Sequence, residues 1–235
     1  MLGRIDCMHW AWKNCPTGWQ GQYSGHVQEP TIILEAVASK DRWIWHAFFG
    51  MPGSHNDINV LHRSPLFAKL AEGKAPEVHY TINGHDYKMG YYLANGIYPA
   101  WASFVKTIPA PHGNKKKHFA RVQESLRKDV ECAFGLLQAR YHIVRGPCRL
   151  WNQEDIYYIM NACVIMHNMT IEDERDMENI DYSYTEMGEP VEASHGVATP
   201  LWEFINNHAV IRNRDIHHQL QADLVEHLWE LHSNN

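Results

Sequence analysis

Apolar residues in the first fifty positions follow the pattern of β-strands. The runs TIILEAVAS (31–39) and RWIWHAFFG (42–50) are rich in β-branched and aromatic residues. Only Lys40 and Asp41 separate these two runs, so together they predict a hairpin. The shorter run LGRID (2–6) precedes them and predicts another strand. The chain is therefore expected to open with three consecutive strands.

The pattern then changes to helical spacing. Residues 52–73 combine a capping residue, Ser54 or Asn56, with apolar positions at helical intervals, and they predict a helix. Residues 77–99 predict a strand, an Asn-Gly turn and a second strand. Several prolines follow and predict an irregular connection before the next regular element.

Three later segments have the periodicity of helices: 115–141, 154–172 and 201–232. Residues 173–200 are acidic, contain Gly and Pro, and show little periodicity, so they predict a linker. Strands, a helix, another strand and a long helix form an α/β order. This order predicts a mixed sheet with an antiparallel start, flanked by helices.

Composition limits the class of protein. A chain of 235 residues with 45% hydrophobic residues can bury a substantial core as one large domain or one domain with appendages. It contains no apolar run of about 18 residues and no signal-peptide pattern, so we expect neither a membrane span nor secretion. The five cysteines form no CxxC pair, which favours reduced thiols over a zinc site or a disulfide framework.

Charge is distributed unevenly along the chain. The net charge is −6, yet residues 106–149 carry +7 and residues 150–235 carry −13. Local charge governs phosphate binding, so the basic segment is a candidate DNA-binding face. The alternative is that its lysines form an ordinary solvated loop. The candidate DNA-binding residues are Lys115, Lys116, Lys117, Arg121, Arg127, Arg140 and Arg145.

Several motifs in order resemble one family. They are IDCMHWAWKNCP, GQYSGH, TIILEAVAS, WIWHAFFGMPGSHNDINVLHRSPLF, NGHDYKMGYYLANGIYPAWASFVKTI, RKDVECAFGLLQARYHIVRGP and IMNACVIMHNM. Across roughly residues 1–230 the chain resembles the PIF/Harbinger DNA transposases, in their plant transposon protein branch. The resemblance implies an RNase H-like fold and a nuclear, metal-dependent endonuclease that cuts and rejoins transposon DNA. It also implies Mg²⁺ or Mn²⁺ as cofactor and a Myb-like protein as a separate DNA-binding partner.

The resemblance also assigns residues to the family's Asp, Asp, Glu triad. The first Asp is Asp6 in IDCMHW, and the Glu is Glu131 in DVECAFG. The second Asp falls in LANGIYP, where this chain has Asn95. Asp57 in SHNDINVL corresponds to a further family acid and is expected to support the metal ligands Asp6 and Glu131, although HND is also a good helix cap.

The resemblance divides the chain into a catalytic domain (1–172), an acidic linker (173–200) and a C-terminal helical segment (201–235). Family members carry an N-terminal helical DNA-binding region. Only five residues precede Asp6, so the resemblance predicts an N-terminally truncated domain.

The amide at position 95 is expected to weaken metal binding and impair catalysis, because it removes one anion from a site that holds divalent cations. Whether the chain is an enzyme therefore stays open. Compensation by Asp57 or deamidation of the Asn95-Gly96 pair would restore activity. The alternatives are a domesticated, non-catalytic DNA- or protein-binding nuclear factor on the same fold, and a decayed transposon product.

Overall fold

The computed structural model describes residues 1–25, 28–74, 78–174 and 200–233. Within these residues the strands form a five-stranded sheet and a separate two-stranded hairpin. The sheet contains β1 (Gly3–Ala11), β2 (Thr31–Ala38), β3 (Ile44–Pro52), β6 (Tyr92–Ala94) and β7 (Phe104–Lys106), and the hairpin contains β4 (Tyr80–Ile82) and β5 (His85–Tyr87). The spatial order in the sheet is β3-β2-β1-β6-β7.

The sheet is mixed. Strands β1, β2 and β3 pair antiparallel, whereas β1, β6 and β7 pair parallel. This confirms the predicted α/β architecture, with a mixed sheet flanked by helices and with helices at the C-terminus, and the arrangement is consistent with the expected RNase H-like fold. The three opening strands are where the apolar runs predicted them.

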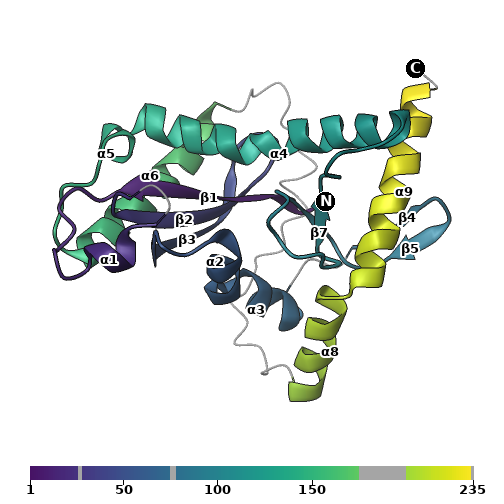
Figure 1. The fold of residues 1–235 in the computed structure, drawn as a ribbon, viewed down its shortest axis with the longest axis horizontal. Coiled ribbons are helices and arrows are strands. Elements are labelled where there is room, and N and C mark those ends of the chain that lie inside the picture. The colour runs from purple at the N-terminus through teal and green to yellow at the C-terminus, as the bar shows by residue number, and fades with distance from the viewer. Residues whose placement is uncertain (26–27, 75–77, 175–199, 234–235) are drawn as a thin grey trace.

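Helices cover both faces of the sheet (Figure 1). They are α1 (Gln20–Tyr23), α2 (Asp57–Arg63), α3 (Pro65–Ala71), α4 (Asn114–Arg140), α5 (His142–Arg145), α6 (Gln153–Asp173), α8 (Leu201–Ile211) and α9 (Arg214–Ser233). On one face, Met8 and Trp10 of β1 and Trp12, which directly follows the strand, pack in one cluster with residues of α4 and α6. On the other face, Ile5 packs with residues of α2 and α3.

Several local features differ from the sequence prediction. Residues 77–99 hold three strands, β4, β5 and β6, instead of two, and the helical segment 201–232 consists of two helices, α8 and α9. The single helix expected over residues 52–73 is two helices, because Pro65 lacks the N–H that a continuous helix needs and α3 begins there. The Ser64 side chain caps the new helix by accepting a hydrogen bond from Leu66 N. Strand β7 lies in the proline-rich segment that was predicted to be irregular. Its three residues are too few for a pattern, and its pairing with β6 defines it.

The C-terminal helices pack against the rest of the chain. Leu220, Leu224 and Val225 of α9 join a buried cluster with Phe119 of α4 and Val105 of β7. Residues 175–199 of the predicted linker lie outside the described residues, and the proposed domain boundaries stay a prediction. No helix in the described parts of the chain is both long enough and apolar enough to cross a membrane.

Candidate functional site

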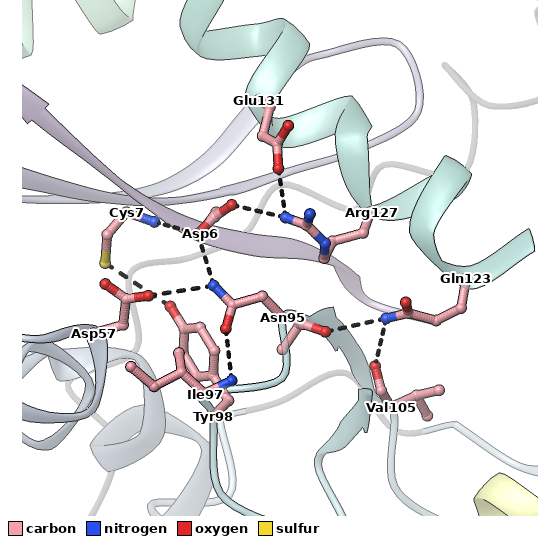
Figure 2. Close-up of polar contacts among 11 residues, drawn as sticks. Asp6, Cys7, Asp57, Asn95, Ile97, Tyr98, Val105, Gln123, Arg127 and Glu131 are labelled. Carbon is pink, nitrogen blue, oxygen red and sulfur yellow. Dashed lines mark hydrogen bonds and ion pairs between the residues drawn. The ribbon is translucent and has the colours of Figure 1, made fainter. Parts of the chain in front are cut away.

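The parallel pairing of β1 and β6 brings the predicted site residues together. Arg4 pairs with Leu93, so Asp6 in the middle of β1 lies level with Asn95, which follows the last residue of β6. Glu131 approaches from α4, and Asp57 is the first residue of α2 (Figure 2). The structure therefore gathers Asp6, Asp57, Asn95 and Glu131, although they come from four different elements.

The Asn95 side chain bridges two carboxylates. Its Nδ2 lies 3.3 Å from Asp6 Oδ1 and 3.3 Å from Asp57 Oδ2, and its Oδ1 accepts a hydrogen bond of 3.0 Å from Ile97 N. The opposite amide orientation would place the carbonyl oxygen against two carboxylates and the NH₂ group against a backbone N–H. Asn95 therefore presents hydrogen-bond donors to the acidic residues.

Arg127 joins Asp6 to the third acidic residue, Glu131. One turn before Glu131 on α4, its Nη1 lies 3.0 Å from Asp6 Oδ2 and 2.5 Å from Glu131 Oε1. The side chains of Arg127 and Asp6 are only 17% and 13% exposed, whereas that of Glu131 is 45% exposed. The guanidinium is therefore the direct counter-charge of a largely buried carboxylate.

Burial dominates the ionisation of Asp6. It raises the pKa of this carboxyl to about 6, because a carboxylate loses hydration when it is buried. The Cys7 N–H, 2.9 Å from Asp6 Oδ1, and the charge of Arg127 favour the ionised form and reduce the rise in pKa. The neighbouring carboxylates Asp57 and Glu131 raise the pKa further by repulsion.

A layer of buried polar groups lies near the acidic residues. Cys7 Sγ is 3.8 Å from the hydroxyl of Tyr98, and burial raises the pKa of both groups, so they stay neutral at physiological pH. Glu35 in β2 is fully buried, 3.3 Å from His46 Nε2, and its Oε1 has no hydrogen-bond partner. The sequence reasoning missed Glu35, although a lone Glu in the apolar run TIILEAVA was a visible signal.

As arranged, these residues do not fit two divalent cations. Such cations require several oxygen ligands around each ion. Here Asn95 offers N–H donors, and the Arg127 guanidinium stands between Asp6 and Glu131. Across the described residues, no group of three or more His, Cys, Asp or Glu side chains is placed to hold a metal ion.

The predicted DNA-binding residues are spread along α4 and α5. Lys115 pairs with Glu226 of α9, and Arg140 pairs with Glu174 after α6. Arg121 contacts His118, while Lys116, Lys117 and Arg145 are exposed. Helix α4 has 27 residues, which is roughly 40 Å of length. Of these seven residues, all of them described, Arg127 contacts Asp6 and Glu131. Contact of the seven residues with DNA stays a prediction.

Fold and site together define an α/β protein with acidic residues on β1, at the start of α2 and on α4, gathered around an amide at the end of β6. The chain belongs to the plant transposon protein family, whose model matches residues 1–178. This range contains the five-stranded sheet and the residues Asp6, Asp57, Asn95 and Glu131. The match supports a transposon-related protein. No curated protein and no solved structure matches the chain.

Proposed function

We propose that this chain is a transposase-derived protein of the DNA endonuclease type whose strand-cleaving chemistry is impaired by Asn95. Membership of the plant transposon protein family supports the class. The observation that carries the proposal is the Asn95 side chain, which lies beside Asp6 and Asp57 with its NH₂ group toward both carboxylates. An amide thus occupies the position where the Harbinger resemblance expects an anion.

The size of the impairment follows from the charge that phosphoryl transfer requires. In this class the reacting phosphate is stabilised by cations that several carboxylates hold in place. Replacing one carboxylate by an amide removes one negative charge from that set. A loss of about 3–4 kcal/mol in transition-state stabilisation corresponds to about two to three orders of magnitude in rate.

DNA binding, a nuclear location and a Myb-like partner belong to the same proposal. The basic residues of α4 support a phosphate-binding role, since Lys116 and Lys117 are exposed and solvent-accessible. A second candidate function is a non-catalytic DNA- or protein-binding factor on the same fold. The ion pairs of Arg127 favour it, because they satisfy the buried acidic charge from within the protein.

Nicking of a labelled supercoiled plasmid tests the proposal. The native chain, Asn95→Asp, Asn95→Asp/Glu131→Gln and Glu131→Gln are compared in Mg²⁺ and in Mn²⁺. Asn95→Asp is expected to nick at least about tenfold faster than the native chain. The restored negative charge should contribute more than about 1.4 kcal/mol of transition-state stabilisation, which corresponds to that factor. The double variant is expected to lose that gain.

Other outcomes separate the two candidate functions. If the native chain nicks as fast as Asn95→Asp and Glu131→Gln abolishes both activities, Asn95 is not the missing ligand. If Asn95→Asp stays inactive while the native chain shifts labelled DNA in a salt-dependent manner, the non-catalytic binding factor is the better description.

A further inference from the structure

We propose that Arg127 takes the place of a divalent cation in the native chain, so that Asp6 and Glu131 are held together without metal. This inference rests on the proposed function only in taking Asp6 and Glu131 as the positions of the ancestral ligands. It assigns to Arg127 a positioning role. The charge pattern of the sequence alone cannot distinguish such a role from a contact to DNA.

The first step is the bridging geometry. A single nitrogen, Arg127 Nη1, lies within 3.0 Å of an oxygen on β1 and within 2.5 Å of an oxygen on α4. A bound metal ion performs the same structural role, because it is a cation shared by carboxylates from different elements. Figure 2 shows the guanidinium between the Asp6 and Glu131 carboxylates.

The second step is that both carboxylate oxygens of Asp6 have partners. Its Oδ1 accepts from Cys7 N at 2.9 Å and lies 3.3 Å from the Asn95 amide, while its Oδ2 pairs with Arg127. Each oxygen of this largely buried carboxylate already has a partner. A divalent cation at Asp6 would therefore meet the Asn95 NH₂ group or the positive charge of Arg127, both of which oppose its binding.

The third step is the dependence of Arg127 on Asn95. The amide donates hydrogen bonds to Asp6 and Asp57 and adds no charge. The Arg127 guanidinium therefore has no further anion at position 95 to neutralise. A carboxylate at position 95 would remove these donors and place an additional negative charge beside two others. The single positive charge of Arg127 would then compensate poorly, and a divalent cation would be favoured in its place.

Manganese binding and thermal unfolding of the full chain test this inference. Arg127→Gln is expected to lower the Tm by several degrees in metal-free buffer, because it leaves buried Asp6 without its counter-charge. Lys128→Gln is the matched control: it removes the same charge from the adjacent, exposed position of α4 and is expected to leave the Tm unchanged. Arg127→Lys keeps the positive charge and is expected to lower the Tm less than Arg127→Gln. It serves as the second variant if Arg127→Gln does not fold.

Calorimetric titration with Mn²⁺ then separates the variants. In the native chain, no Mn²⁺ binding is expected to depend on Asp6. The native chain and Asp6→Asn should therefore give the same titration. Asn95→Asp/Arg127→Gln is expected to bind Mn²⁺ at least about tenfold more tightly than Asn95→Asp/Lys128→Gln, a difference of 1.4 kcal/mol or more. In the first of these double variants, Mn²⁺ is expected to raise the Tm.

Two results would overturn the inference. One is Mn²⁺ binding by the native chain that is lost in Asp6→Asn. The other is equal Mn²⁺ affinity of the two double variants together with an unchanged Tm in Arg127→Gln. Neither readout uses DNA cleavage, so inactivity of Asn95→Asp would contradict the proposed function and leave the role of Arg127 to be judged on its own data.

Discussion

Gln123 shows at the residue scale how one side chain positions the end of β6. It is 3% exposed on α4, and its Nε2 donates to Ala94 O and Val105 O, each at 3.1 Å (Figure 2). These carbonyls belong to two neighbouring parallel strands, and Ala94 directly precedes Asn95. A single amide therefore fastens the long helix to the strand end that carries the site.

Replacing Gln123 by Met tests this role. Met has a similar volume but no donor, so two buried carbonyls lose their hydrogen bonds. The free energy of unfolding in urea is expected to fall by about 1–3 kcal/mol. Ser125→Ala, at an exposed position of the same helix, is the control and is expected to change stability by less than about 0.5 kcal/mol. Equal stability of the two variants would contradict the role given to Gln123.

At the scale of elements, α9 is bound to the sheet and to α4 by both apolar and polar contacts. Leu220 is 1% exposed in the cluster that includes Phe119. Asp223 of α9 lies 3.0 Å from His85 Nδ1 and accepts a hydrogen bond from the Tyr87 hydroxyl, so the helix also holds the β4–β5 hairpin. The C-terminal helix thus contributes to the same core as β7.

Leu220→Ala measures how far this contribution extends. Removing a buried leucine side chain is expected to lower the free energy of unfolding by about 2–5 kcal/mol, through lost burial and the cavity left behind. Leu231, near the end of α9, is 50% exposed, and Leu231→Ala is expected to have little effect. A single unfolding transition, shifted as a whole by Leu220→Ala, would show that α9 unfolds together with the sheet. A separate transition would support an independent C-terminal segment.

For the molecule as a whole, buried histidines make the fold sensitive to acid. His167 is fully buried, its Nε2 donates to Arg42 O at 2.9 Å, and its Nδ1 lies 3.4 Å from Arg140. Burial lowers its pKa from the ordinary value of 6.5, and burial lowers the pKa of His217 in the same way. Both rings are therefore held in the neutral form.

The sign of the pH effect follows from proton binding. Below about pH 6.5 the unfolded chain binds a proton at His167 that the folded chain does not, so unfolding becomes easier as the pH falls. The stabilising contribution is complete above that pH. Urea unfolding of the native chain and His167→Gln at pH 7.5 and 5.5 is expected to show a smaller loss of stability for the variant. Asp6 titrates in both proteins, so their difference isolates His167, and parallel pH profiles would contradict this account.

Much of the fold could be predicted from the sequence because its signals are local. Alternating and continuous apolar runs marked β1, β2 and β3, and helical periodicity marked α4 and α6. The break at Ser64-Pro65 and the strand β7 were not predicted. The first depends on how Pro65 restarts the helix, and the second depends on a partner strand twelve residues earlier.

By itself the sequence determined most of the elements, and the family resemblance of its motifs assigned Asp6, Asn95 and Glu131 to one site. Only the tertiary structure decided what these residues contact: the NH₂ group of Asn95 faces two carboxylates, and Arg127 lies between Asp6 and Glu131. The physical reason is distance along the chain. Strand and helix propensities arise among near neighbours, whereas Asp6 and Arg127 are 121 positions apart and meet only because β1 and α4 pack together.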